Sequence, residues 1–366
     1  MPISRFAQTL GRNATILLTV AVAATVATFV ARVAGGAEVL VFVLSAVALG
    51  GLAGLVGEAT DQIGARLGAG ATGVLQSALG NLPELFISIF ALQAGLVRVV
   101  QTALIGSILA NSLLVLGLAF LLGGLRHGVQ RFQAAPVRTM AILLMLAVGA
   151  LLIPTLATQP GAPDAGHQLD LSEEVSIVLL IVFAASIPYS IGGGPGASAI
   201  GVSVEEGDVW AMPLAIGVLA GAGAGAALVS DWFVEALRPA MAGLGLSEEF
   251  VGLVIVAIAG NAVENVVGIQ MAMRNRMDLA ISLILNSSLQ VAIALTPALV
   301  LISLLIGGSA LTLILTPLLL AAVALTALLA AMVVFDGEST WLEGLALLGL
   351  YVIIAASVWY GPPIQG

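Results

Sequence analysis

The chain has 366 residues, of which 60% are hydrophobic and 8% are charged, and its formal net charge is −9. Soluble domains contain about 25% charged residues, so this composition excludes a mainly soluble protein and indicates one that crosses a membrane many times. The absence of cysteine excludes disulfides and thiolate metal sites, and the negative charge argues against nucleic acid as a partner.

A helix that crosses the hydrocarbon core of a membrane needs about 20 apolar residues. On this basis we predict an all-α polytopic membrane protein with about 11 transmembrane helices. The first segment follows Arg5 and Arg12 and is long enough to span, so we interpret it as a helix and not as a signal peptide. The predicted segments are Ala14–Val33, Ala37–Leu67, Ala71–Gly95, Val97–Gly123, Pro136–Ala157, Leu171–Ile191, Trp210–Leu237, Phe250–Met273, Met277–Ile306, Ala310–Phe335 and Trp341–Tyr360.

A glycine-rich stretch followed by acidic residues divides the predicted helices into two groups. This connecting loop, residues 192–209, contains Glu205, Glu206 and Asp208. It separates a first half, residues 37–191, from a second half, residues 210–366, and residues 1–36 form an extra amino-terminal helix. Each half contains five predicted helices. Because five is odd, the halves have opposite orientations, which is a 5+5 inverted-topology repeat.

Arginine in short loops predicts the orientation of the chain, because cytoplasmic loops carry the excess of basic residues. With the amino terminus in the cytoplasm, eight arginines lie on that side and three on the other. We therefore predict a multi-pass protein of the cytoplasmic membrane, with its amino terminus inside and its carboxyl terminus outside. The inner set is Arg5, Arg12, Arg66, Arg126, Arg131, Arg138, Arg274 and Arg276, and the outer set is Arg32, Arg98 and Arg238.

Each half contains one copy of the pattern Gly-Asn-x-x-Glu inside an apolar segment. The first copy holds Asn81 and Glu84, and the second holds Asn261 and Glu264. A residue pair three apart falls on one face of a helix. Carboxylates at mid-membrane depth are costly unless they bind something. Pro83 and the small residues around both copies favour a local break in the helix, which frees backbone carbonyls.

Two carboxylates with amide and carbonyl oxygens form an all-oxygen site, which suits a hard cation and Ca²⁺ best. The same carboxylates also bind protons, so one site can serve Ca²⁺ and H⁺ in turn. A buried structural role for the two glutamates is the alternative, and their duplication at matched positions argues against it.

Further polar residues follow at matched distances. Ser107 lies 26 positions after Asn81, and Ser287 lies 26 positions after Asn261. A single serine in a membrane helix is more often packing than function. Structural roles for Asp61 and Asp231, on the second and seventh predicted helices, are as compatible with the sequence as gating or proton relay. The full supporting set is Ser107, Asn111, Ser287, Ser288, Gln290, Asp61, Asp231 and Asn265.

The two Gly-Asn-x-x-Glu segments and the helices that follow them resemble the Ca²⁺/H⁺ antiporter (cation exchanger) family of the Ca²⁺/cation antiporter superfamily. The resemblance implies eleven helices, an inverted five-plus-five core, and Ca²⁺ held by Glu84 and Glu264. It also implies an acidic loop between the sixth and seventh helices. The sequence departs from the family where Asn265 replaces a histidine and where Asp61 and Asp231 replace glutamates.

We therefore expect a secondary transporter, not an enzyme, that exchanges Ca²⁺ for H⁺ by alternating access at a two-glutamate midplane site. No cofactor is expected, and the partners are the two transported ions and the lipid bilayer; a homo-oligomer is compatible with the sequence. The first alternative is a Na⁺/Ca²⁺ or other cation/H⁺ exchanger of the same superfamily. The remote alternatives are an intramembrane aspartyl protease that uses Asp61 and Asp231, and a passive channel, which tight ion binding disfavours.

Overall fold

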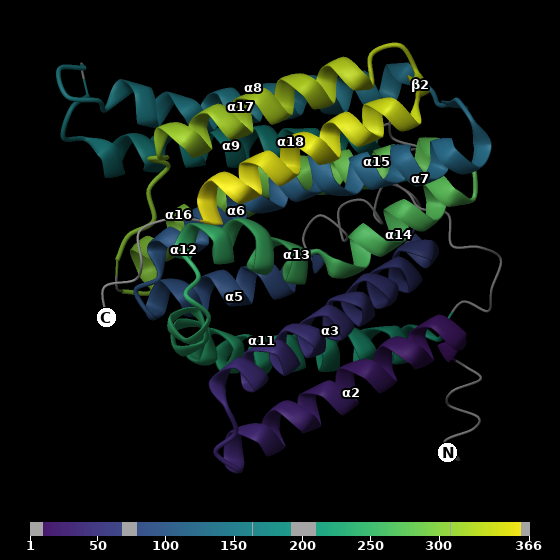
Figure 1. Cartoon of the computed structure of the whole chain (residues 1–366), viewed down its shortest axis with the longest axis vertical. Coiled ribbons are helices and arrows are strands. Elements are labelled where there is room, and N and C mark those ends of the chain that lie inside the picture. Colours follow the sequence, from purple (N-terminus) through teal and green to yellow (C-terminus); the bar gives the residue numbers. More distant parts are fainter. Residues whose placement is uncertain (1–9, 68–78, 163, 192–209, 308, 360–366) are drawn as a thin grey trace. The chain divides into compact units, whose positions relative to one another are not determined.

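The structure is a computed structural model that describes residues 10–67, 79–162, 164–191, 210–307 and 309–359 (Figure 1). These residues are mostly helical, as predicted. They include one antiparallel ribbon, in which β1 (Gln130–Arg131) pairs with β2 (Glu338–Ser339). The helical elements are α2 (Arg12–Val33), α3 (Glu38–Leu67), α5 (Leu82–Gln93), α6 (Val97–Leu109), η1 (Ala110–Val115), α7 (Leu116–His127), α8 (Ala134–Ala157), α9 (Gln168–Ile191), α11 (Met212–Leu244), α12 (Glu248–Phe250), η2 (Val251–Val256), α13 (Ala257–Gly260), α14 (Ala262–Met273), α15 (Met277–Gln290), η3 (Val291–Leu295), α16 (Thr296–Leu305), α17 (Pro317–Val333) and α18 (Trp341–Trp359).

Among the described residues, seven helices are long and apolar enough to cross a membrane, or eight if the bent pair Glu248–Gly260 and Glu264–Met273 is one span. The structure thus confirms a polytopic helical membrane protein, while the predicted number of eleven spans stays a prediction. Two predicted spans contain shorter helices than expected, because α5 has 12 residues and α17 has 17. Residues 68–78, which include the first part of the third predicted span, lie outside the described residues.

The chain forms two compact units, and each takes segments from both predicted halves. Unit 1 comprises Met1–Phe90, Gly201–Gly245 and Ala259–Val263. Unit 2 comprises Ala91–Ile200, Leu246–Ile258 and Glu264–Gly366. The division into an extra helix, two sequential halves and a connecting loop stays a prediction, since residues 192–209 lie outside the described part of the chain.

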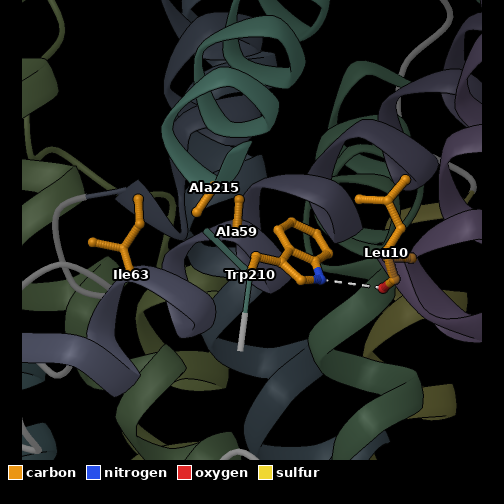
Figure 2. Packing of buried hydrophobic residues seen from close by; sticks show 6 residues of the cluster. Leu10, Ala59, Ile63, Trp210 and Ala215 are labelled. Carbon is orange, nitrogen blue, oxygen red and sulfur yellow. Dashed lines mark hydrogen bonds between the residues drawn. The ribbon is translucent and has the colours of Figure 1, made fainter. Parts of the chain in front are cut away.

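In unit 1, α3 packs along both α2 and α11 (Figure 1). Trp210, which follows the connecting loop, is fixed to the end of α3. Its indole N–H donates to the carbonyl of Leu10 at 3.2 Å (Figure 2), and its own carbonyl accepts from the Arg66 guanidinium at 2.7 Å. Its backbone N–H donates to Gln62 at 2.8 Å. The apolar cluster around it consists of Leu10, Ala14, Ala59, Ile63, Trp210 and Ala215.

One end of unit 2, here called the ribbon end, gathers helix termini around β1 and β2. The amide of Gln130 in β1 donates to Asn275, just before α15, at 2.9 Å. The backbone N–H of Gln133 donates to Asp278 in the first turn of α15 at 2.6 Å. Arg138, in the first turns of α8, donates to the carbonyl of Phe335 after α17. The carboxyl ends of α7 and α17 therefore lie beside the amino ends of α8 and α15.

The opposite end of unit 2 is held by a second set of contacts. Arg98, at the start of α6, forms a 2.9 Å ion pair with Glu249 of α12. Ser247, before α12, donates to the carbonyl of Val358 near the end of α18 at 2.6 Å. Consequently α6 to α7 runs from the opposite end to the ribbon end, and α15 to α16 begins at the ribbon end.

Helix boundaries repeat along the chain with a constant offset of 180 positions. The helix α5 begins at Leu82 and α14 at Ala262, while α6 begins at Val97 and α15 at Met277. A π-helical segment follows in both cases, as η1 after α6 and η3 after α15. The matched pieces α6–η1–α7 and α15–η3–α16 run in opposite directions within unit 2 (Figure 1). Both features are what an inverted repeat requires, and the full five-plus-five arrangement stays a prediction.

The prediction of a helix from Ala310 was wrong in its first part. Leu311–Leu315, here called the extended segment, is not helical, and the helix α17 begins only at Pro317. Apolar environments require every backbone polar group to have a partner. Side-chain hydroxyls are the partners of three of the backbone N–H groups. The N–H of Leu311 donates to Ser303 Oγ at 2.9 Å, that of Leu313 to Ser172 Oγ at 3.0 Å, and that of Leu315 to Thr155 Oγ1 at 2.8 Å.

Side chains also satisfy carbonyl groups of the extended segment. The amide of Gln101 donates to the carbonyl of Thr312 at 2.9 Å, and Thr155 donates to the carbonyl of Leu313 at 3.0 Å. These partners come from α6 and α8, far away in the sequence. Hydropathy could not show them, because it reports only the apolar character of the segment itself.

Candidate ion-binding site

Both copies of the Gly-Asn-x-x-Glu pattern interrupt a helix, as Pro83 and the small residues predicted. In the first copy, Gly80 and Asn81 form a turn before α5 begins. In the second copy, Asn261 separates α13 from α14, and the flanking helices are bent by 66°. Breaks of this kind leave backbone groups outside the helical hydrogen-bond ladder.

Each break places its glutamate in the first turn of a new helix. Glu84 lies in the first turn of α5, and Glu264 lies in the first turn of α14. The unpaired N–H groups and the positive end of the helix dipole at this position stabilise a negatively charged side chain. The two glutamates therefore occupy equivalent positions at the start of a helix.

In unit 1, parts of both copies lie together. The side chain of Glu84 is 1% exposed, and it packs against Gly260, where an added Cβ would lie 3.5 Å from Glu84 Cβ. Asn81 is 8% exposed and Asn261 is 2% exposed. The space beside Gly260 is therefore bounded by this glutamate side chain.

In unit 2, Glu264 is the end of a chain of side-chain hydrogen bonds. The hydroxyl of Ser287 in α15 donates to Glu264 Oε2 at 2.9 Å. The amide of Asn111 in η1 donates to Ser287 Oγ, also at 2.9 Å. Asn111 and Ser287 are both buried. The structure thus brings three of the predicted site residues into direct contact.

A second polar pair lies beside this chain. Ser112 and Ser288, the next residues on the same two helical segments, share a 2.9 Å hydrogen bond. The bond of Ser112 with another serine agrees with a role in helix packing. Ser107 and Gln290 are buried as well. The sequence placed both residues on the helices that follow the two glycine motifs, but it did not pair them, since Asn111 lies 30 positions after Asn81 and Ser287 lies 26 positions after Asn261.

The remaining candidates lie in different environments. Asn265 follows Glu264 and is 8% exposed, and its Oδ1 atom has no hydrogen-bond partner among the described residues. Asp61 is partly buried in α3 of unit 1, whereas Asp231 is exposed on α11. Arg66, five residues after Asp61, donates to the carbonyl of Trp210.

The arrangement suits a cation bound by few carboxylates and several neutral oxygens. In the described part of the chain, no three histidine, aspartate or glutamate side chains cluster closely enough to hold a metal. A cation at either glutamate would need hydroxyl, amide and carbonyl oxygens to complete its shell. Calcium accepts such mixed oxygen shells, with 6–8 ligands in flexible geometry.

Comparison with known proteins agrees with this chemistry. The sequence pattern of the family described as sodium/calcium exchanger protein matches residues 37–192 and 214–360. The Ca(2+)/H(+) antiporter of Synechocystis is 35% identical, with 92% of this chain and 95% of that protein covered. The Ca(2+)/H(+) antiporter ChaA of Bacillus subtilis is 33% identical, with 86% and 91% covered.

Solved structures agree in fold. The structure of native YfkE is 31% identical and superposes with a TM-score of 0.80, with 94% of this chain and 99% of that chain covered. The crystal structure of an H+/Ca2+ exchanger, CAX, superposes with a TM-score of 0.72 over 94% of this chain and 91% of its own, at 16% identity. The second likeness shows a shared fold.

Proposed function

The chain belongs to the sodium/calcium exchanger family, and from that premise we propose that it exchanges Ca²⁺ for H⁺ across a membrane at a site formed by Glu84 and Glu264. It is a secondary transporter and not an enzyme. Two relatives that are at least 33% identical over most of their length are Ca(2+)/H(+) antiporters by name, which supports these two ions as the transported partners. No cofactor is required by this exchange.

The observation that carries the proposal is the matched placement of the two glutamates. Each follows a helix break, each lies in the first turn of the next helix, and the two helices begin 180 positions apart. The glycine of the second motif packs against Glu84, and Glu264 is four positions further along the chain. A structural role does not require this duplication, whereas a repeat-built transporter does.

Calcium ions and protons compete for the same carboxylate oxygens, and this competition couples their transport. Ionised carboxylates bind Ca²⁺, and protonated carboxylates have lost the charge that attracts it. Proton binding from one side therefore releases Ca²⁺, and Ca²⁺ binding on the other side releases protons. Antiparallel repeat segments, such as α6–α7 and α15–α16, allow the site to face each side in turn.

The orientation in the cytoplasmic membrane is part of the same proposal. Arg126 and Arg131 belong to the ribbon end of unit 2, and Arg274 and Arg276 adjoin the start of α15 there. This excess of basic residues supports a cytoplasmic location for the ribbon end. The helix α18 runs away from that end, which supports an external carboxyl terminus.

The test is ⁴⁵Ca²⁺ uptake by proteoliposomes under an imposed pH gradient, in the wild type and in Glu84→Gln and Glu264→Gln. We expect uptake that collapses when the gradient is dissipated, and loss of uptake in both variants. Glu338→Gln is the matched control, because this glutamate is partly exposed and pairs with Arg131 at the ribbon end.

Two results would count against the proposal. Full uptake in both glutamine variants would remove these glutamates from the site. Uptake driven by a Na⁺ gradient and not by a pH gradient would assign the chain to Na⁺/Ca²⁺ exchange, and Asn265, which stands at a histidine position, would be the first residue to examine.

A further inference from the structure

The extended segment in unit 2 has two sides, and the N–H groups on them are bonded differently. In an extended backbone, the N–H and C=O groups of one residue point to the same side, and the next residue points to the opposite side. The N–H groups of Leu311, Leu313 and Leu315 share one side, where hydroxyls of α16, α9 and α8 accept from them. Thr312 and Ile314 belong to the other side, which faces α6.

On the side of α6, one side chain serves the backbone. The amide of Gln101 donates to the carbonyl of Thr312 at 2.9 Å and to that of Ile314 at 3.4 Å. Within the described part of the chain, the N–H groups of these two residues have no acceptor. An unpaired peptide group is costly in an apolar interior. These two N–H groups therefore require an acceptor that is not part of the protein.

A small cavity lies at this side of the segment. Its volume is about 20 Å³, and its walls include Gln101, Thr312 and Thr296 among leucine and isoleucine side chains. The Thr296 side chain is buried, and its Oγ1 atom has no hydrogen-bond partner among the residues that the structure describes. One water molecule needs roughly 10–15 Å³, so it fits here. Dry cavities are lined by apolar groups alone, whereas this cavity has an unpaired hydroxyl.

A larger cavity adjoins the small one. Its volume is about 200 Å³, and Arg98, Glu249 and Ile314 are among the residues that line it. Gln101 and Leu315 line both cavities, so the two meet there. The Arg98 side chain is 52% exposed and forms the ion pair with Glu249. The larger cavity thus opens at the end of unit 2 opposite the ribbon end.

We propose that the two cavities form a water-filled inlet, which enters unit 2 beside Arg98 and ends at the Thr296 hydroxyl. Its water molecules accept hydrogen bonds from the N–H groups of Thr312 and Ile314. Two N–H groups beside an arginine would also suit an anion, but the Glu249 carboxylate lines the same cavity and repels one. Water is therefore the ligand, and the inference does not depend on which ions the protein exchanges.

Hydrogen–deuterium exchange of the wild-type protein in lipid nanodiscs tests the inlet directly, with single amides resolved by electron-transfer fragmentation. The amides of Thr312 and Ile314 should exchange about tenfold faster than those of Leu311, Leu313 and Leu315, because water meets the first two and buried hydroxyls protect the other three. Equal protection of all five amides would show a dry interior and overturn the inference.

The inner end of the inlet is tested by Thr296→Val, which keeps the shape of the side chain and removes its hydroxyl. Exchange at Thr312 should become severalfold slower, since the small cavity loses a polar partner for its water. The matched control is Thr326→Val, because the buried hydroxyl of Thr326 bonds to its own helix, and it should leave this rate unchanged. An unchanged rate in Thr296→Val would contradict an inlet that reaches this residue.

The outer part is tested by thiol labelling, for which the chain is suited because it contains no cysteine. Ile314→Cys should react with the hydrophilic reagent methanethiosulfonate ethylammonium, since a thiol ionises only where water reaches it. Two controls should stay unlabelled. Ala103→Cys is buried on α6 and lines neither cavity, and Leu325→Cys is exposed on the apolar helix α17.

Two labelling results would overturn the inference. An unreactive Ile314→Cys would show that water does not enter the larger cavity. Protection of the same thiol by millimolar inorganic phosphate would assign the cavity to an anion in place of water. If Ile314→Cys fails to fold, which size-exclusion chromatography in detergent reveals, the exchange pattern of the wild-type protein decides.

Discussion

Glu84 and Gly260 face each other within unit 1 with room for one methyl group between them: an added Cβ on the glycine would lie 3.5 Å from Cβ and 3.6 Å from Cγ of the glutamate. This approach joins the two Gly-Asn-x-x-Glu motifs, because the glycine of one lies beside the glutamate of the other. A residue at 260 therefore controls the space in which the Glu84 side chain lies.

The first prediction follows from that approach. Gly260→Ala should fold and transport, because 3.5 Å is an ordinary contact distance. Gly260→Val adds two methyl groups where Glu84 lies and should reduce ⁴⁵Ca²⁺ uptake by at least tenfold with little change in thermal stability. Gly217→Val is the control, since an added Cβ there meets nothing within 4 Å. Normal uptake in Gly260→Val would show that the position of Glu84 is not critical.

The second prediction concerns the packing of α6 on η2 in unit 2. A Cβ on Gly106 would lie 2.6 Å from Leu253 Cα, so backbone has to move to admit it. Gly106→Ala should destabilise the protein by about 1–3 kcal/mol, as overpacking does. A thermal melt in detergent checks this against Gly149→Ala, where an added Cβ meets nothing. Equal melting temperatures for the two variants would contradict the close approach.

The third prediction concerns the extended segment. Thr155 accepts from the N–H of Leu315 and donates to the carbonyl of Leu313, so Thr155→Val leaves two buried backbone groups without this partner. Each such loss costs about 1–3 kcal/mol. Thr139→Val, on the same helix, is the matched control, because its hydroxyl bonds only to Ala135 of its own helix. A drop in melting temperature is expected for Thr155→Val alone.

The fourth prediction concerns Asn265, whose Oδ1 is buried without a partner among the described residues. An unsatisfied buried oxygen costs free energy, so Asn265→Leu should raise the melting temperature. If that oxygen serves the transported ions, the same variant should also lower ⁴⁵Ca²⁺ uptake. Higher stability with unchanged uptake would assign Asn265 no part in transport.

The sequence predicted the parts of the site that depend on local signals. Gly80, Asn81 and Pro83 predicted a helix break, and the structure has one there. The equal spacing of Ser107 and Ser287 from their motifs predicted matched helices, and the helix boundaries repeat with one offset. Both predictions rest on residues that lie close together along the chain, where backbone preferences decide the structure.

The sequence did not predict features that depend on distant partners. The segment from Ala310 is apolar enough for a helix, but Gln101, Thr155 and Ser172 provide its backbone with other hydrogen bonds. The π-helical segment η1, which contains Asn111, has no signal in the amino-acid composition either. A hydropathy window contains no information on which hydroxyl from another helix will reach a given peptide group.

The extended segment also bears on how the protein is made. Gln101, Thr155, Ser172 and Ser303, which satisfy its backbone, all precede it in the chain, so a ribosome delivers them to the membrane before Leu311. Three of the four belong to the first predicted half. If the second half were synthesised alone, the backbone N–H groups of Leu313 and Leu315 would enter the membrane without these hydrogen-bond partners. Although the two halves repeat one pattern, the second half needs hydrogen-bond partners from the first half for the backbone of its extended segment.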